Sequence, residues 1–546
     1  MNRDRTATSR IRGGAGEGLR VGAFVEALRQ VAGEEAGERR WVFVPYDQLH
    51  DAIGPLAQEP ADELGIVMIE SRAKAGRRPY HKQKLALVLA NMRHFALEQA
   101  ERGVAVRYVD AGDDDYATTL GGLHGELGTI GVMRPAELEL RQELQPLFAN
   151  GELEELPHEG WLTTGDDFGA IKGPPWRMDA FYRQVRKRTG ILMEDGKPVG
   201  GKFSFDADNR ERWDGEPAAP PLPTFEVDDV TREVCQLVER TFGDHPGELR
   251  PEHLPATRDD AERMWAWALD ECMVHFGPYE DAMSTKSTNL FHTRVSPLLS
   301  LHRLLPQRVV DDVVAADLPL NSKEGFVRQV LGWREFVRHV HETTDGFRDL
   351  DDNVLQGDVD LPPVFWGGKP SGLHCLDRVV DDVWREAYSH HITRLMILGN
   401  LATLIGVSPR QLSDWFWVAY ADAYDWVVEP NVLAMATYGV GELMTTKPYV
   451  AGSAYIAKMS DYCKSCAFHP KKTCPITRLY WAFLSRNAER LDGNQRIAMP
   501  LRSLEKRKAD EVKLDAATAT WVRSRLAKGD ELRVDDAPAN ADARRG

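Results

Sequence analysis

Four cysteines restrict how the C-terminal half of this chain can fold. Cys463 and Cys466 form a C-x-x-C motif, Cys474 follows them and precedes a proline, and Cys375 lies far upstream. Four thiolates that converge on one point can hold a four-iron cluster or a zinc ion. The spacing alone leaves both ligands open. Either one would bring the segment around Cys375 against the segment that carries the other three cysteines.

Composition limits where such a chain works and what it binds. The 546 residues are 42% apolar, enough to bury more than one core. No run approaches the roughly eighteen apolar residues of a membrane span, and the N-terminal segment lacks the apolar stretch of a secretory signal. We therefore expect a cytoplasmic protein without a membrane partner, in which clustered cysteines favour metal or iron-sulfur ligation over disulfides. The net charge of −16 confines any nucleic-acid contact to a local basic patch.

Composition and periodicity divide the chain into five parts. Residues 1–40 have little apolar periodicity and are expected to be a disordered extension, and residues 41–160 read as an α/β domain. Residues 161–230 are a connector rich in proline and glycine. Residues 231–500 are almost wholly helix-like, and residues 501–546 form a charged tail in which one helix extends and then frays.

The α/β part alternates short apolar runs with helical periodicity. Such alternation is typical of a doubly wound parallel sheet, whose strands are covered on both faces. No G-x-G-x-x-G motif marks it as a dinucleotide domain. Ligands of such folds bind at the carboxyl ends of the strands, which here brings in Asp47 and Glu70. The expected strands are WVFVPY, LGIVMIES, VAVRYVD, GTIGVMRP and LEELP, and the long helix is KQKLALVLANMRHFALEQAERG.

The connector holds one amphipathic basic helix, MDAFYRQVRKR. Its cationic residues are Arg183, Arg186, Lys187 and Arg188. A solvated basic face is the commoner reason for such a run, and a phosphate contact is the alternative.

A second helix combines charge with apolar periodicity. In HITRLMILGNLATLIG, His391 and Arg394 share a face with leucines at spacings of three and four. An arginine there needs an acidic partner, and Asp422 and Asp425 are the candidates by type. A structural ion pair between helices is the alternative to a functional pair.

Five segments, in this order, resemble the iron-sulfur bacterial cryptochromes and photolyases. They are GKFSFDADNR (201–210), RQVLGWREF (328–336), AYSHHITRLMILGN (387–400), YADAYDWVVEPNVLAMATYG (420–439) and TKPYVAGSAYIAKMSDYCKSC (446–466). The resemblance spans roughly residues 41–500 and implies the cryptochrome/photolyase architecture. This has an α/β antenna domain, a large all-α domain that binds FAD, and a 4Fe-4S cluster on Cys375, Cys463, Cys466 and Cys474.

The resemblance also implies an activity. The family includes DNA photolyases, carbon-carbon lyases that act as monomers on UV-damaged DNA. An electron passes from photoexcited reduced FAD to a (6-4) pyrimidine photoproduct, and a proton must reach the departing group. His391, next to His390, matches the active-site histidine, and an imidazole can give and regain a proton near neutral pH. A buried structural histidine is the alternative reading.

The resemblance places further residues around the flavin and the lesion. They are Tyr279, Thr293, Ser296, Gln329, Trp333, Arg334, Arg394, Asp422 and Asn431. The diphosphate-binding motif T-S-x-L-S of photolyases departs here at its first two residues, which are His292 and Thr293. Arg394 and Asp422 would pair beside the isoalloxazine and stabilise its reduced form.

Electrons reach the flavin of this family through aromatic side chains. The matching positions are Trp366, Trp415 and Phe416, and phenylalanine is not readily oxidised. The neighbouring residues that could replace Phe416 are Trp417, Tyr420 and Tyr424.

The antenna site departs from the family pattern. Members that bind 6,7-dimethyl-8-ribityllumazine use acidic and tyrosine side chains where this chain has Lys74 and Arg77. Asp47 and Glu70 remain, so we expect either this chromophore between the strand ends or an altered or empty antenna site.

Two other classes share part of these features. A blue-light receptor of the cryptochrome kind would keep the flavin and the cluster but signal through a partner without repairing DNA. A non-photoactive iron-sulfur protein that binds nucleic acid would lack light-reducible flavin.

Overall fold

The computed structural model describes residues 22–32, 38–349 and 353–538. The chain forms two compact units that are each discontinuous in sequence. The first comprises Met1–Leu162, Leu222–Trp267 and Arg294–Asp311, and the second comprises Thr163–Pro221, Ala268–Thr293 and Asp312–Gly546. Within the described ranges, no helix combines the length and the apolarity that crossing a bilayer requires.

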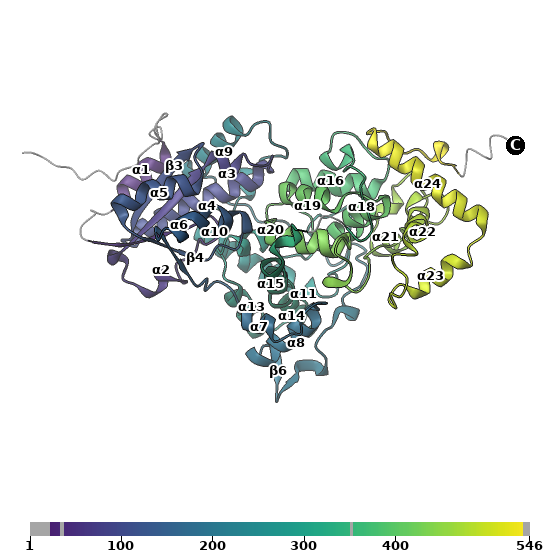
Figure 1. Ribbon diagram of the computed structural model, residues 1–546, viewed down its shortest axis with the longest axis horizontal. Coiled ribbons are helices and arrows are strands. Elements are labelled where there is room, and N and C mark those ends of the chain that lie inside the picture. Colours follow the sequence, from purple (N-terminus) through teal and green to yellow (C-terminus); the bar gives the residue numbers. More distant parts are fainter. Residues whose placement is uncertain (1–21, 33–37, 350–352, 539–546) are drawn as a thin grey trace, which may run out of the picture. The chain divides into compact units, whose positions relative to one another are not determined.

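The first unit is built on a five-stranded parallel sheet (Figure 1). The strand order is β3-β2-β1-β4-β5, and β2 is buried at every position because both faces of the sheet are covered. The strands are β1 (Arg40–Phe43), β2 (Leu64–Ser71), β3 (Ala105–Gly112), β4 (Ile130–Met133) and β5 (Leu153–Leu156). All five expected strands are confirmed, and so is the doubly wound sheet.

Helices surround this sheet (Figure 1). The long helix α4 begins where the His81 side chain accepts a hydrogen bond from the backbone N–H of Gln83, and it packs on β2, β3 and α9. Because α9 packs on α4, the stretch Leu222–Trp267 belongs with the sheet, although the sequence analysis placed 231–500 in a helical domain. The helices are α2 (Pro55–Gln58), α3 (Arg72–Ala75), α4 (Lys82–Glu101), α5 (Tyr116–Leu127), α6 (Leu138–Ala149), α9 (Asp229–Thr241), α10 (Arg258–Trp267) and α12 (Ser296–Ser300).

The expectation of a disordered extension over residues 1–40 is wrong for one segment. Helix α1 (Ala23–Val31) buries Phe24, Val25 and Leu28 and packs on α4 and α9. The Phe24 ring lies 4.6 Å from the ring of Tyr108, so a short apolar stripe anchors this helix. Residues 1–21 and 33–37 of the same prediction lie outside the described part of the chain.

The second unit is helical, with one small hairpin, and this confirms the expected all-α part. The hairpin strands are β6 (Met193–Glu194) and β7 (Lys197–Pro198). The helices are α7 (Gly165–Gly169), α8 (Met178–Thr189), α11 (Met273–Phe276), α14 (Leu320–Val327), α15 (Glu335–Thr344), α16 (His374–Glu386), α17 (His391–Thr393), α18 (Asn400–Ile405), α19 (Pro409–Ala419), α20 (Asp425–Val428), α21 (Ser453–Met459), α22 (Pro475–Asn487), α23 (Ala498–Glu505) and α24 (Ala509–Ala527). Helix α13 (Pro306–Ala315) crosses the boundary between the units.

Wide π-helical turns interrupt several helices of the second unit. They are η5 (Ala268–Cys272), η6 (Arg328–Arg334), η9 (Arg394–Gly399) and η10 (Glu429–Ala436). Three of them carry residues that the family resemblance assigns to the flavin. Such turns are rare and are frequent at functional sites, because they re-aim side chains that a regular helix would stack.

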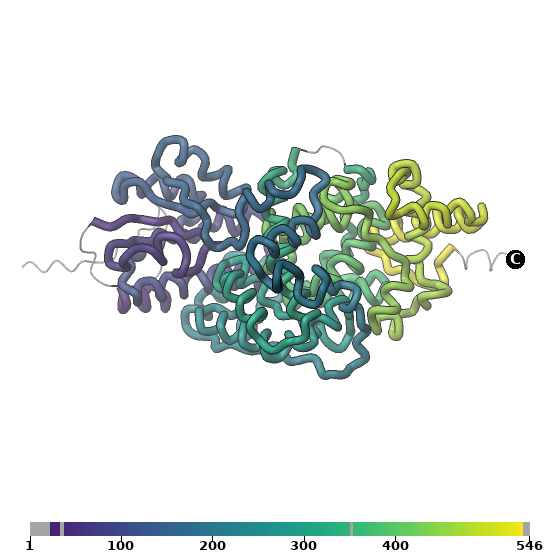
Figure 2. The backbone as a smooth tube through the Cα atoms, turned by 90° about the horizontal axis from the view of Figure 1, so that it is seen from below, coloured from purple at the N-terminus to yellow at the C-terminus, as the bar shows by residue number. Residues whose placement is uncertain are grey.

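The charged tail does not fray after one helix. Helix α24 packs along α22, and both belong to the C-terminal part of the chain at the yellow end of the colour bar (Figure 2). Val522 and Leu526 are buried in this contact, while Arg507 and Arg478 both bond to Asp515. The tail is therefore part of the helical core as far as residue 538.

The basic helix α8 does not present its central arginine to phosphate. Arg186 is 1% exposed, and its guanidinium donates to the carbonyls of Ile191, Leu192 and Phe203 at 2.6–3.1 Å. Arg188 pairs with Asp167 on α7. The prediction of a phosphate contact is wrong for Arg186, because its N–H donors already bond to backbone carbonyls of the residues that follow the helix.

Candidate functional site

Three histidines of the second unit lie together. One ring nitrogen from each of His292, His390 and His391 falls within 4.8 Å of the others. The rings of His292 and His390 are buried and stack at 4.3 Å with planes 11° apart. The His391 side chain is 42% exposed, and its Nε2 lies 3.7 Å from Asp281. The cluster therefore has a buried floor and one accessible imidazole.

Burial determines the protonation state of His292 and His390, the two histidines that form the floor of the cluster. It lowers the pKa of His390 and of His292 well below the ordinary value, and the neighbouring His391 and Arg394 lower both further. Both rings are thus neutral at physiological pH and can donate or accept one hydrogen bond on each nitrogen.

The stacking favours a polar ligand over a metal ion. An imidazole binds a metal through a lone pair in the plane of its ring. Since the planes of His292 and His390 are nearly parallel, those lone pairs cannot meet at one point in this arrangement. Buried polar atoms without partners occur on two of these histidines and on Asn289, whose backbone carbonyl accepts a hydrogen bond from the N–H of His292: they are both side-chain polar atoms of Asn289, Nε2 of His292 and Nδ1 of His390. Leaving them unbonded is costly, so they fit a polar ligand.

An ion pair lies next to the cluster. Arg394 binds Asp422 through two hydrogen bonds of 2.9 Å, and its Nε donates to the carbonyl of Ser389. Its guanidinium also covers the ring of Tyr420 at 4.1 Å. Burial opposes the charge, but the Asp422 carboxylate outweighs it and holds the pKa of Arg394 above its ordinary value. Of the two acidic partners that the sequence proposed for Arg394, the structure selects Asp422.

The segment 279–281 connects several expected site residues. The Tyr279 ring lies 5.3 Å from Phe291, the Gln329 amide donates to Glu280 at 2.7 Å, and Asp281 faces His391. Tyr279 is therefore part of the segment that contacts the accessible His391, and Gln329 bonds to this segment.

The remaining expected residues have other neighbours. Arg334 pairs with Glu335 at 2.9 Å and covers the ring of Trp426, and burial, followed by the charge of Arg338, lowers its pKa to about 10. Trp333 contacts Phe336, and Asn431 donates to the carbonyl of Val427 in its own helix. Thr293 is buried in the second unit, and Ser296 begins α12 in the first.

Tryptophans connect this region to the surface of the second unit. Trp366 is 44% exposed and stacks on Trp384 at 5.8 Å, and Trp384 meets Trp415 at 6.0 Å. Trp415 is 1% exposed and lies 6.1 Å from Tyr420, the ring that Arg394 covers. The indole N–H groups of Trp384 and Trp415 both donate to the carbonyl of Phe365, at 2.8 and 3.0 Å.

Sequence reasoning missed Trp384. It found Trp366 and Trp415, but their separation in sequence carries no sign of what lies between them. The helical period of α16 was the available signal, because it buries one face and leaves Trp384 beside Trp366. Phe416 stacks on Tyr420 at 5.2 Å, but Trp415 itself lies 6.1 Å from Tyr420, so the two rings are neighbours without a step through the phenylalanine.

The four predicted cysteine ligands also approach one another. Cys375 lies in the first turn of α16 and Cys474 caps the start of α22, where helix dipoles favour thiolates. Burial raises the pKa of Cys375 well above its ordinary value, and the other three thiolates raise it further. Four such thiolates ionise together only around a positive centre.

Four cysteine thiolates at one place can hold a zinc ion or a 4Fe-4S cluster, so the donor set fits both of the ligands that the sequence leaves open.

The expected antenna residues are occupied by other contacts. Glu70 is buried and accepts hydrogen bonds from Arg93 at 2.6 and 3.0 Å and from the Tyr108 hydroxyl. Lys74 binds Glu137 at 2.5 Å, and Arg77 binds two further glutamates. Asp47 is buried, and its carbonyl bonds to His302 at 2.6 Å.

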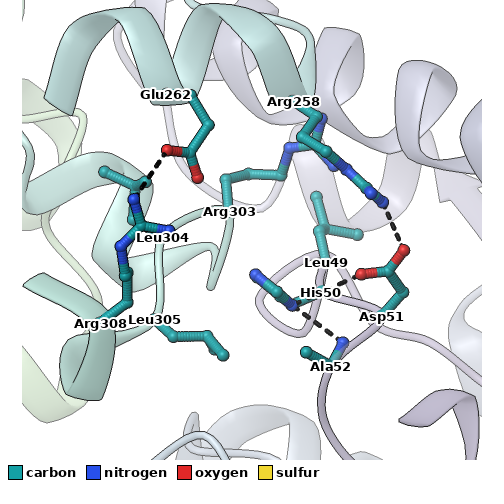
Figure 3. A pocket seen from close by; sticks show the side chains of 10 residues that line it. All are labelled: Leu49, His50, Asp51, Ala52, Arg258, Glu262, Arg303, Leu304, Leu305 and Arg308. Atoms are coloured by element: carbon teal, nitrogen blue, oxygen red, sulfur yellow. Dashed lines mark hydrogen bonds and ion pairs between the residues drawn. The ribbon is translucent and has the colours of Figure 1, made fainter. Parts of the chain in front are cut away.

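A cavity of about 330 Å³ lies in the first unit (Figure 3). Asp47 and Glu70 do not line it. His50 does, and burial is the main cause that lowers its pKa to about 4. The arginines of the lining pair with carboxylates: Arg258 with Asp51, Arg303 with Glu98 and Arg308 with Glu262. The cavity is thus nearly charge-compensated.

Comparison with known proteins identifies the family. A family model described as deoxyribodipyrimidine photo-lyase-related protein matches residues 42–254. A curated relative, the (6-4) photolyase of Agrobacterium fabrum, is 36% identical over 485 residues, covering 84% of this chain and 94% of the relative.

Solved structures share the fold. A bacterial class III photolyase from Agrobacterium tumefaciens aligns with a TM-score of 0.51 at 13% identity, covering 90% of this chain and 97% of the other. An archaeal photolyase from Sulfolobus tokodaii, solved with two FAD molecules, aligns with a TM-score of 0.50 at 13% identity, covering 92% and 100%. A parallel α/β unit joined to a helical unit thus defines a protein of photolyase architecture. The chain belongs to the cryptochrome/photolyase family.

Proposed function

We propose that this protein is a light-driven DNA photolyase that acts on (6-4) pyrimidine photoproducts in UV-damaged DNA. The observation that carries the proposal is the accessible His391 over a floor of buried, unbonded polar atoms, next to the Arg394 and Asp422 pair. The 36% identity to a (6-4) photolyase over most of both chains supports it.

The residues of the floor fit FAD. Asn289, His292 and His390 offer the unbonded polar atoms, and the Arg394 guanidinium supplies a fixed positive charge beside them. When bound, FAD supplies a ring that absorbs blue light and gives up an electron. Arg394, held rigid by Asp422, would stabilise negative charge on a reduced ring, and a buried site excludes water from it.

His391 is the proposed proton donor. Its exposure lets Nε2 reach a nucleotide flipped out of the duplex, and the Asp281 carboxylate lies 3.7 Å from that nitrogen. His390 below it stays neutral and positions its neighbour.

Two further groups belong to the proposal. Cys375, Cys463, Cys466 and Cys474 would hold a 4Fe-4S cluster, and the proximity of the other three thiolates to Cys375 supports this. A 6,7-dimethyl-8-ribityllumazine antenna is the less supported group, because Glu70, Lys74 and Arg77 are already engaged in salt bridges. An absorption spectrum of cofactors released from the purified protein would detect either chromophore.

The aromatic series Trp366, Trp384, Trp415 and Tyr420 is the proposed route by which electrons enter from solvent. Each ring centroid lies 5.8–6.1 Å from the next, and the series ends at Arg394. Its surface end is Trp366.

The proposal is tested by a repair assay on DNA that carries either a (6-4) photoproduct or a cyclobutane dimer. We expect blue light to restore the (6-4) substrate and darkness to leave it unchanged. Repair of the cyclobutane dimer alone would change the substrate assignment. Flavin that is reduced by light without repair of either lesion would favour a blue-light receptor.

A further inference from the structure

Three arginines of the second unit gather at one turn. Arg486 lies in the last turn of α22, Arg490 lies in the turn that follows this helix, and Arg523 lies on α24. A β-carbon placed on Gly406 would be 3.2 Å from Nη2 of Arg523 and 3.4 Å from Nη2 of Arg486. Gly406 ends α18 with a φ of +79°, a conformation that favours glycine and keeps this space open to both guanidinium groups.

These arginines lack acidic partners. Among the described residues, no carboxylate oxygen lies within 4.0 Å of any of the three side chains. Arg486 donates to the carbonyl of Leu404 at 3.3 Å, and Arg490 donates to Gln356 and to a backbone carbonyl. Nε of Arg523 is buried and has no partner. The arginines that line the cavity in Figure 3, in contrast, pair with carboxylates. The chain has 84 acidic and 68 basic residues, so carboxylates are not scarce in it.

The cluster is electrostatically strained. Burial and then the charges of Arg523 and Arg490 lower the pKa of Arg486 to about 10, and Asp358 offsets this only in part. Burial also lowers the pKa of Arg523, and Asp358 offsets this in part. Guanidinium groups carry like charges that repel one another, and an anion between the three side chains would relieve the repulsion.

We infer that Arg486, Arg490 and Arg523 form a binding site for a phosphate group. Planar guanidinium groups bind phosphate oxygens through paired N–H donors, and arginine is preferred over lysine where such forks converge. The phosphate can belong to a free phosphorylated molecule or to a nucleic-acid backbone. Gly406 lies roughly 18 Å along the helix that begins at Arg394, from a rise of about 1.5 Å per residue, so this site is separate from the histidine cluster.

The first experiment measures thermal unfolding of the full-length protein, with its bound cofactors, against inorganic pyrophosphate at constant ionic strength. We expect the melting temperature to rise with saturation in the wild type. Arg523→Gln should melt no lower than the wild type in the absence of pyrophosphate, because a repulsion is removed, and should lose the response. Arg502→Gln, which removes an exposed arginine on α23, is the matched control and should keep the response.

The second experiment separates the two sources of phosphate. If a nucleic-acid backbone supplies it, Arg523→Gln lowers affinity for an undamaged duplex in an anisotropy titration. It also reduces the slope of log affinity against log salt by about one. If a free molecule supplies it, duplex affinity is unchanged while the pyrophosphate response is lost. If Arg523→Gln does not fold, Arg490→Gln at an exposed position gives the same test.

The inference is overturned if pyrophosphate does not stabilise the wild type and the variants bind duplex as tightly as it does. It is equally overturned if Arg502→Gln abolishes the pyrophosphate response to the same extent as Arg523→Gln.

Discussion

His390 and His391 are adjacent in sequence but occupy opposite environments. His390 is buried with an unbonded Nδ1, whereas nearly half of the His391 side chain is exposed beside Asp281. A pair of identical residues at the start of a helix cannot reveal from sequence which one faces the substrate. The backbone of η9 and α17 decides this.

Replacing His391 by Ala should therefore abolish repair without removing FAD. General acid catalysis is worth about 100- to 10,000-fold, so we expect a loss of repair rate in that range, with flavin absorbance per protein unchanged. The measurement is restoration of a (6-4) oligonucleotide under blue light.

His124→Ala, at a partly exposed position on α5 in the first unit, is the matched control and should repair normally. Repair by His391→Ala at the wild-type rate would remove this residue from the mechanism.

His50 makes stability depend on pH. Its pKa falls from 6.5 to about 4 in the folded state, so the unfolded chain binds the extra proton between these values. The stabilisation is complete above pH 6.5 and decreases as the pH falls toward 4, by at most about 1.4 kcal/mol per pH unit. Denaturant unfolding at several pH values should show a smaller decrease for His50→Gln. An identical slope in both proteins would mean that His50 is protonated in the fold.

Single residues also show where sequence reasoning succeeds. Arg394 lies on an apolar helix face, so the need for an acidic partner followed from its position, and Asp422 fills that role. Arg186 also lies on an amphipathic helix, yet its partners are backbone carbonyls of a following loop. Helical periodicity says that a charge needs a partner, but only the fold says which one.

At the scale of elements, α16 serves two parts of the helical unit. Its first turn carries Cys375, and its last turns carry Trp384, which bridges Trp366 and Trp415. The sequence revealed the cysteine through its partners in the C-x-x-C segment. For the tryptophan the helical period of α16 was the available signal, but that period does not show which rings on other elements Trp384 contacts.

Trp384→Phe should slow photoreduction of the flavin strongly, because phenylalanine keeps the packing but is not readily oxidised. The measurement is the rate of flavin reduction under blue light with an external thiol. Trp481→Phe, which changes a tryptophan that contacts Tyr480 and Arg507, is the matched control. If Trp384→Phe reduces its flavin as fast as the wild type, electrons enter by another route.

The π-helical turns are the elements that sequence reasoning missed entirely. Residues 328–334, 394–399 and 429–436 lie in the part of the chain that is expected to be helix-like, and in residues 394–399 regular periodicity placed the side chains on one face. A wide turn needs no special residue, so composition gives no signal of it. The strands of the sheet, in contrast, were found because burial on both faces requires continuous apolar runs.

At the scale of the whole molecule, the two units are interleaved in sequence. The stretches 222–267 and 294–311 belong with the parallel sheet although they are helical. A prediction from composition assigns every helix of this region to the helical domain. The contact between α9 and α4 shows that α9 belongs with the parallel sheet instead.

The cysteines link segments far apart in the second unit, so losing one should weaken the whole unit. We expect purified wild-type protein to contain iron and acid-labile sulfide, and Cys375→Ser to lose both and to melt at a lower temperature. Elemental analysis and calorimetry are the measurements. Cys235→Ser changes a buried cysteine of the first unit and should keep the iron. A wild-type preparation with zinc and no iron would replace the cluster by a zinc site.

The carbonyl of Phe365 accepts hydrogen bonds from two indoles at once. An amide oxygen is too weak a base to remove a proton from an oxidised tryptophan. A positive hole on Trp384 or Trp415 would therefore keep its proton and remain free to move between the two rings. Charge separation along this path should then be insensitive to heavy water, and deprotonation should occur only where a ring meets solvent, at Trp366.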